Sequence, residues 1–159
     1  MLSKEEITAL LAPIPDPEIP VITIQDLGIL RNVEVVGNKV IVQITPTYNG
    51  CPAMNVIEKE IIQTLHENGV KDVEVKLVYT PAWTTDWLSA DAKERLREYG
   101  IAPPEAGSGD YKRLKGESIR CPRCGSTETT LVSSFGSTAC KALYKCKSCL
   151  EPFDHFKCH

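Results

Sequence analysis

The sequence lacks long apolar runs and several motifs that mark common enzyme classes. No stretch of the 159 residues comes near the roughly 18 apolar residues that a membrane span needs. The opening Met-Leu-Ser-Lys-Glu-Glu has neither the basic segment nor the apolar run of a secretory signal, so we expect a cytoplasmic protein. Dinucleotide-binding glycine loops, the P-loop and the Glu-x-x-His pair of di-iron bundles are also missing. These absences disfavour a dehydrogenase, a nucleotidase and an oxygenase.

A strong positive charge and a large aromatic content are also missing. The net charge is −3 and aromatic residues make up 6%, which argues against a nucleic-acid binder. Apolar residues at 42% and charged residues at 25% are ordinary for a globular protein. Residues 119–159 carry six Lys and Arg against three Asp and Glu, whereas residues 1–118 carry 12 against 18. This difference between +3 and −6 suggests two modules.

Cysteine is plentiful and unevenly placed. Six of the seven cysteines lie after position 120. In a reducing compartment, thiols in such a cluster are expected to be metal ligands or reactive groups rather than disulfides.

Hydrophobic periodicity, caps and turn residues predict an α+β class for residues 1–101. Proline-rich residues 13–20 form an ordered loop, and Gly37-Asn38 fits a two-residue hairpin turn. We expect a small three-stranded, or slightly larger, mixed sheet with helices on it. The expected helices are 3–12, 52–68 and 89–99, and the expected strands are 33–36, 40–45 and 73–79. Residues 102–118, rich in Pro, Gly, Ser and charge, are interpreted as a linker.

The segment 119–159 contains two Cys-x-x-Cys knuckles, Cys121 with Cys124 and Cys146 with Cys149. Two such knuckles build a closed tetrahedral site, which predicts a zinc-ribbon-like mini-domain. Zinc is the metal that this site favours, and iron is the less favoured alternative. The plainer interpretation, isolated buried thiols, does not explain the paired spacing. A closed site has no open position for substrate, so we expect structural metal and no catalysis there. About 40 residues make too small a core, so the metal is expected to supply much of the folding free energy.

Cys140 and Cys158 lie outside the two knuckles. Three interpretations remain open: they pair with each other, they join a second metal site, or they are buried thiols.

Cys51 is the only cysteine in the first module. It lies where a strand ends and a helix begins, and unpaired N–H groups and the helix dipole favour an anion at such a place. A thiol there is expected to carry more thiolate, which suits a nucleophile or a transient metal ligand. A small residue filling a tight turn explains the position as well. Neither His66 nor His155 is an evident base partner, so a hydrolase is disfavoured.

Several motifs resemble known families. Residues 16–20 (DPEIP), 24–29 (IQDLGI) and 45–52 (TPTYNGCP) are similar to the iron–sulfur assembly domain of metal–sulfur cluster biosynthesis proteins. Together with residues 81–87 (PAWTTDW), 96–104 (LREYGIAPP), 135–144 (FGSTACKALY) and 151–158 (EPFDHFKC), they resemble the D-subunit family of the phenylacetyl-CoA epoxidases (ring-1,2-epoxidases). This resemblance covers nearly the whole chain.

The resemblance implies an accessory role in aerobic phenylacetate degradation, in which the chain is not itself an enzyme. It implies assistance to iron or iron–sulfur centre assembly, with the di-iron oxygenase and the flavin/[2Fe–2S] reductase as partners. It also implies cluster handling by Cys51, with Asp16 and Glu18 on a loop that borders the same region.

Two hypotheses follow. In the first, Cys51 transiently holds iron or a cluster; one thiolate is too few for stable binding, so a homodimer or a client complex would supply the rest. In the second, the chain is a structural or regulatory subunit without metal delivery. A nucleic-acid adaptor is disfavoured by the acidic first module, and no membrane partner is expected.

Overall fold

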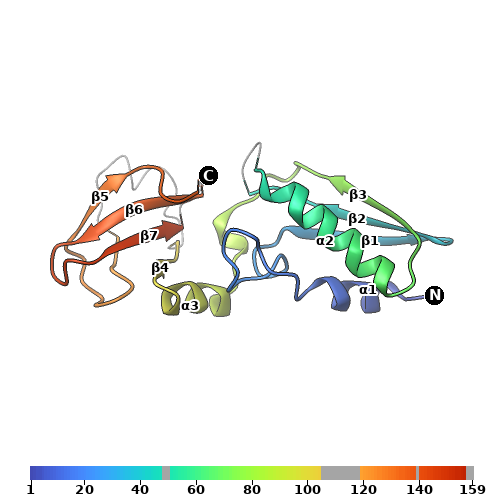
Figure 1. The fold of residues 1–159 in the computed structure, drawn as a ribbon, viewed down its shortest axis with the longest axis horizontal. Coiled ribbons are helices and arrows are strands. Elements are labelled where there is room, and N and C mark those ends of the chain that lie inside the picture. Colours follow the sequence, from blue (N-terminus) through green and yellow to red (C-terminus); the bar gives the residue numbers. More distant parts are fainter. Residues whose placement is uncertain (48–50, 105–118, 139, 157–159) are drawn as a thin grey trace. The chain divides into compact units, whose positions relative to one another are not determined.

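The computed structural model describes residues 1–47, 51–104, 119–138 and 140–156, without the side chain of Thr85. Figure 1 shows these residues as two compact units, Met1–Trp83 and Thr84–His159. The division lies between Trp83 and Thr84, earlier than the boundary expected at residue 101, because the helix Ala90–Glu98 and the strand Ile101–Ala102 belong to the second unit. Most of the expected linker, residues 105–118, lies outside the described residues.

The first unit is the small mixed sheet with helices that the sequence predicts. Its elements are α1 (Lys4–Leu11), β1 (Leu30–Val36), β2 (Lys39–Ile44), α2 (Ala53–Glu67) and β3 (Asp72–Leu77). The sheet order is β1-β2-β3, with β1 antiparallel and β3 parallel to β2. The α+β class and the three strands are therefore confirmed.

Local sequence signals account for these elements. Ser3 and Glu6 form a capping box at the start of α1. Gly37, with a φ of 60°, allows the tight turn between β1 and β2. One stripe of α2 is buried in the core of the unit, and its members are Ala53, Met54, Ile57, Ile61 and Leu65.

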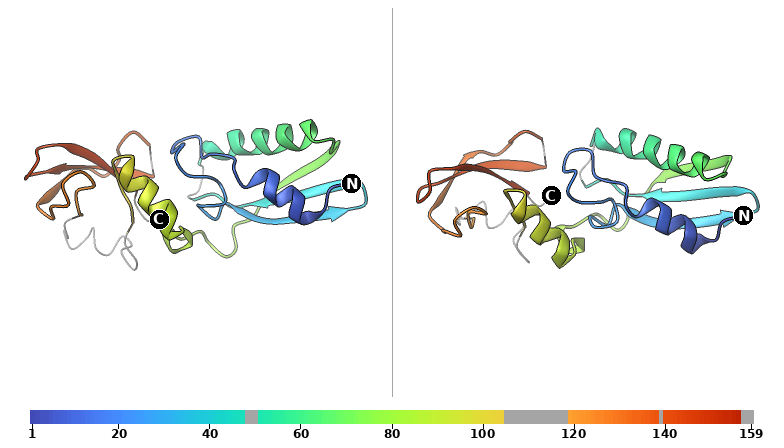
Figure 2. Two further views of the ribbon diagram at one scale, coloured as in Figure 1. Left: turned by 90° about the horizontal axis from the view of Figure 1, so that it is seen from below. Right: turned by 60° about the horizontal axis from the view of Figure 1, so that its bottom comes forward.

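The proline-rich segment between α1 and β1 is ordered and packed. Pro15 and Thr23 form an isolated antiparallel bridge, and the N–H of Asp16 donates to the carbonyl of Ile22. Six of its apolar side chains are almost wholly buried; they are Ile14, Ile19, Ile22, Ile24, Leu27 and Ile29. Figure 2 shows this segment beside the first turn of α2, which places it at the start of that helix.

The second unit contains a four-stranded sheet that the sequence did not predict. Its elements are η1 (Thr85–Trp87), α3 (Ala90–Glu98), β4 (Ile101–Ala102), β5 (Thr129–Ser133), β6 (Lys141–Cys146) and β7 (Pro152–Phe156). The order is β4-β7-β6-β5, with β4 parallel to β7 and the other pairs antiparallel.

The core of the second unit is small and contains two of the predicted metal ligands. Tyr144 stacks on Phe153 with ring centroids 5.8 Å apart. The buried cluster consists of Ala102, Ile119, Cys121, Ala142, Tyr144, Cys146 and Phe153. Phe156, at 2% exposure, is also buried.

None of the helices in the described parts of the chain is long and apolar enough to cross a membrane.

Candidate functional site

The four predicted ligands converge in the second unit. The sulfur atoms of Cys121, Cys124, Cys146 and Cys149 all lie within 4.8 Å of one another. The Cys121–Cys149 pair is 3.8 Å apart and the Cys124–Cys146 pair is 3.6 Å apart. Zinc bound tetrahedrally at about 2.3 Å places its sulfurs about 3.8 Å from one another. The four side chains therefore fit one tetrahedral metal ion, and this is a metal-binding site.

The two knuckles have the same backbone design. The N–H of Cys121 donates to the carbonyl of Ser126, and the N–H of Cys146 donates to the carbonyl of Glu151, five residues on in each case. The residue after the second cysteine has a positive φ in both, 77° at Gly125 and 66° at Leu150. Glycine adopts this conformation readily, whereas leucine rarely does, so the sequence gives no signal for the turn at Leu150.

Hydrogen bonds make the sulfurs of the second knuckle unequal. The backbone N–H of Cys149 donates to the sulfur of Cys146, and together with Ser148 and the neighbouring thiols it lowers the pKa of Cys146 to about 6. The N–H of Glu151 acts to lower the pKa of Cys149, but burial and the neighbouring thiols raise it to about 12. Cys146 therefore ionises first, and a cation meets a thiolate there at neutral pH.

The site is anchored on one side and open on the other. Cys121 and Cys146 are buried at 1% and 0% exposure, whereas Cys124 is exposed. The hydroxyls of Ser126 and Ser148 are hydrogen-bonded at 2.8 Å and join the two knuckles. With all four ligands from protein, the arrangement holds a metal without a vacant position, which suits structure rather than catalysis.

Cys51 lies at the start of α2, as predicted. It directly precedes Pro52, the N-cap of the helix, whose own side chain makes no capping hydrogen bond. The residue is only 8% exposed. The three residues before it, 48–50, lie outside the described residues. The helix start supplies N–H groups that favour an anion, although enclosure limits how a client can reach the sulfur.

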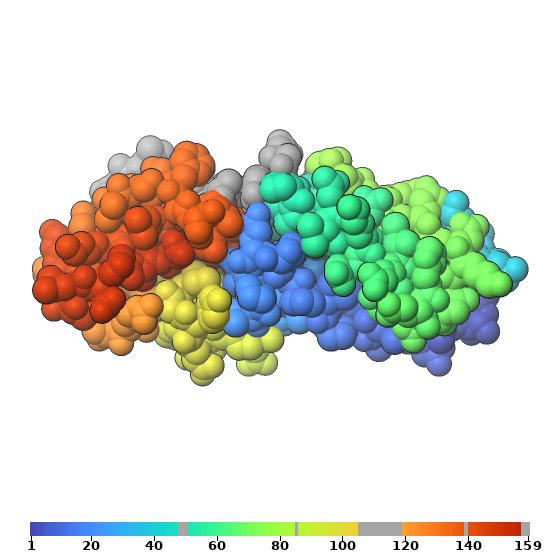
Figure 3. Space-filling view, viewed as in Figure 1, coloured from blue at the N-terminus to red at the C-terminus, as the bar shows by residue number. Residues whose placement is uncertain are grey.

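Asp16 organises its own loop. The residue is 7% exposed, and its Oδ1 accepts hydrogen bonds from the N–H groups of Glu18 at 2.9 Å and Ile19 at 2.8 Å. Glu18 is half-buried. Figure 3 shows this segment, in blue, against the first turns of α2, in teal. The loop therefore borders the Cys51 end of the helix, and the Asp16 carboxylate holds the turn.

Cys140 is a buried thiol whose sulfur lies 3.0 Å from the hydroxyl of Thr138. Cys158 lies outside the described residues.

His155, to which the sequence assigned no role, is 4% exposed, and its Nδ1 lies 3.0 Å from the carbonyl of Ala102. This contact fastens β4 to β7 and explains why the histidine is buried.

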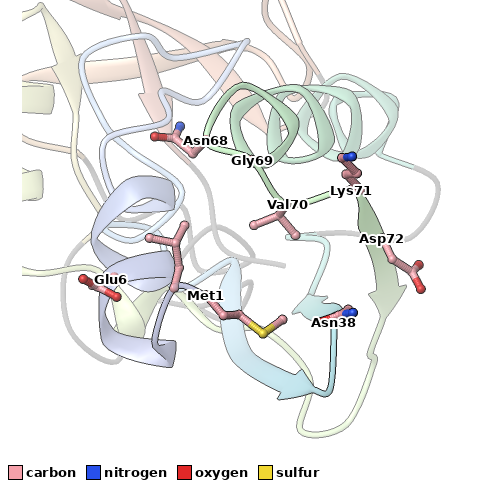
Figure 4. A pocket seen from close by; sticks show the side chains of 9 residues that line it. Met1, Glu6, Asn38, Asn68, Gly69, Val70, Lys71 and Asp72 are labelled. Atoms are coloured by element: carbon pink, nitrogen blue, oxygen red, sulfur yellow. The ribbon is translucent and has the colours of Figure 1, made fainter.

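A hollow of about 610 Å³ lies at the other end of α2. Figure 4 shows its lining, which comes from the N-terminus, the β1–β2 turn and the α2–β3 connection. None of the predicted site residues lines it.

Comparisons with known proteins match the N-terminal and the C-terminal parts of the chain to two different families. Residues 4–80 match the family model "Iron-sulfur cluster assembly protein", and residues 105–157 match "PaaD zinc beta ribbon domain". A relative from Escherichia coli (strain K12), named as the D subunit of a 1,2-phenylacetyl-CoA epoxidase, is 58% identical over 96% of this chain and 92% of that protein.

Two further similarities each cover about three fifths of the chain. The "Fe-S protein maturation auxiliary factor" of Porphyromonas gingivalis is 36% identical over 59% of this chain and 90% of its own length. The crystal structure of the domain of unknown function DUF59 from Bacillus anthracis has a TM-score of 0.54 at 29% identity, covering 58% of this chain and 90% of that one. Each of these two proteins therefore matches this chain over nearly all of its own length.

Proposed function

The chain belongs to the D-subunit family of the 1,2-phenylacetyl-CoA epoxidases, and from this premise we propose that it is a non-enzymatic accessory protein that assists assembly of the iron or iron–sulfur centres of such an epoxidase. Its place of action is the cytoplasm. Its clients are the di-iron oxygenase subunit, the flavin/[2Fe–2S] reductase subunit, or both.

The observation that carries the proposal is the pairing of two modules in one chain. The first matches an iron–sulfur assembly family and keeps a cysteine at a helix start, and the second holds a closed four-thiolate site. The second site takes zinc, because four thiolates in tetrahedral arrangement suit this ion and leave no position for exchange. Transient iron or cluster handling then falls to Cys51.

Substitution of Cys51 tests this division of labour. We expect that Cys51→Ser, co-expressed with the epoxidase subunits, leaves the oxygenase or the reductase with severalfold less iron or acid-labile sulfide. Cys140→Ser makes the same chemical change at another buried thiol and serves as the control, with normal loading expected. Thermal unfolding of both variants checks that the fold is kept. Full loading with Cys51→Ser contradicts metal delivery through this thiol.

A second function, that of a structural or regulatory subunit, is favoured by the enclosure of Cys51. A residue that is 8% exposed offers little surface to a client. This alternative predicts co-purification with the other subunits at a fixed ratio, unaffected by Cys51→Ser.

A further inference from the structure

Strand β3 forms an open edge of the first sheet. The sheet order is β1-β2-β3, and no strand among the described residues pairs with the outer side of β3. Figure 1 shows β3 at the margin of the sheet. An open edge presents unpaired N–H and carbonyl groups that can pair with another chain.

One hydrogen bond shows which main-chain groups of β3 point toward β2 and which point away from it. The N–H of Val78 donates to the carbonyl of Ile44 on β2 at 2.8 Å. Because N–H and carbonyl groups of alternate residues point to the same side, the groups of Val73, Val75 and Leu77 point away from β2. These three residues supply six outward main-chain groups.

The charges on β3 are complementary to a second copy of the same strand. Glu74 and Lys76 flank Val75, and their side chains are 38% and 49% exposed. When two β3 strands pair antiparallel about an axis at Val75, Glu74 faces the partner subunit's Lys76, and the reverse pair forms by symmetry. Moving the axis by one residue places Glu74 against the partner's Glu74, or Lys76 against the partner's Lys76. Like charges directly opposite are destabilising, so the charges select the register at Val75.

The same register suits the main chain and the apolar side chains. It matches Val75 with the partner's Val75, and Val73 with the partner's Leu77, all of which have outward hydrogen-bonding groups. Leu77 is 45% exposed in the single chain and would gain an apolar neighbour. On the other face, Glu74 also pairs with Lys39 at 2.6 Å, which holds its carboxylate over the strand.

We propose that the chain forms a homodimer through antiparallel pairing of β3 with β3 of a second copy, centred on Val75, to give a continuous six-stranded sheet. This assembly goes beyond the proposed function and does not depend on it. The two Leu77 residues would lie about 13 Å apart along the strands, since four residues separate their positions at about 3.3 Å each. The Cys51 ends of the two α2 helices then point away from the axis, so each copy works on its own client rather than sharing one cluster.

Sedimentation velocity of the full chain tests the dimer between about 1 and 200 µM, a range that includes the affinities expected of small interfaces. A reductant is present because Cys124 is exposed and could form disulfides. We expect a monomer–dimer equilibrium. Glu74→Lys should weaken it at least about fivefold, because two symmetry-related pairs change from attraction to repulsion. The double variant Glu74→Lys/Lys76→Glu should restore it.

Two further variants separate this surface from general effects. Val75→Pro removes an outward N–H that β2 does not use, and should abolish the dimer while thermal unfolding shows an intact fold. Glu34→Lys reverses a charge on β1, at the opposite edge, and should leave the dimer unchanged. A chain that stays monomeric at the highest concentration overturns the proposal. A dimer that survives Glu74→Lys and Val75→Pro, or that the double variant fails to restore, overturns it equally.

Discussion

At the scale of single residues, Leu150 is the least expected feature of the metal site. Among the described residues it is the only one besides glycine with a positive φ, and its side chain is 68% exposed. The matching position of the first knuckle is Gly125. A left-handed conformation costs an L-residue about 1–2 kcal/mol, so the second knuckle is strained where the first is not.

We therefore expect Leu150→Gly to stabilise the metal-loaded protein. Relief of the strain is partly offset by the greater freedom of glycine in the unfolded chain, about 0.5–1 kcal/mol, so the net gain is up to about 1.5 kcal/mol. Urea unfolding at a fixed zinc concentration measures it. Leu150→Ala removes the same exposed side chain but keeps Cβ, and should bring no such gain. A loss of stability with Leu150→Gly would show that the leucine side chain contributes more than its backbone costs.

At the scale of elements, Thr129 ties β5 to the segment that leads into the first knuckle. Its hydroxyl accepts from the N–H of Ile119 at 3.1 Å and donates to the carbonyl of the same residue. Thr129→Val keeps the shape but removes both bonds, so we expect the second unit to lose about 1–3 kcal/mol. Chemical denaturation followed by amide hydrogen exchange in β5 and β6 measures the loss. Thr130→Val, at an exposed position on the same strand, is the control and should change stability little.

Most elements of the first unit could be predicted because their signals are local. The capping box of α1, the turn at Gly37 and the buried stripe of α2 are each visible within a few neighbouring residues. The sheet of the second unit could not be predicted in this way. Ile101 pairs with Asp154, 53 residues further on, and β5 shows mostly exposed side chains without alternation. Long-range pairing, rather than propensity, fixes these strands.

The metal centre was predictable for the same reason, and the setting of Cys51 was not. Two Cys-x-x-Cys spacings determine local turns whose sulfurs converge, and the structure brings Cys121, Cys124, Cys146 and Cys149 together. The burial of Cys51, which is 8% exposed at the start of α2, depends on tertiary packing around that helix end. A single sequence carries no local signal for such packing.

At the scale of the whole molecule, acid should release the metal in a defined range. The pKa of Cys146 is lowered to about 6 by the N–H of Cys149, so its thiolate is present above pH 6 and is lost as the pH falls through this value. Protons compete with metal for thiolates, and bound zinc holds the thiolates ionised below the pKa of the free thiols, so zinc retention should fall only as the pH drops below about 6. A chromophoric zinc indicator follows the release. Retention unchanged well below pH 5 would contradict this role of the Cys146 thiolate.

Removal of the metal at neutral pH should unfold one unit and spare the other. The core of Thr84–His159 includes two of the ligands, Cys121 and Cys146. Without the metal, their thiolates repel one another or become hydrated, and either change disrupts the packing of this core. The core of Met1–Trp83 contains none of the four. With a chelator added to the full chain, we expect amide hydrogen exchange to show loss of protection in β6 and β7, while α2 and β2 stay protected. Added zinc should restore it. Protection of β6 retained without metal would mean that the Tyr144–Phe153 stack is sufficient to hold this sheet, and simultaneous loss in α2 would mean that the two units fold as one.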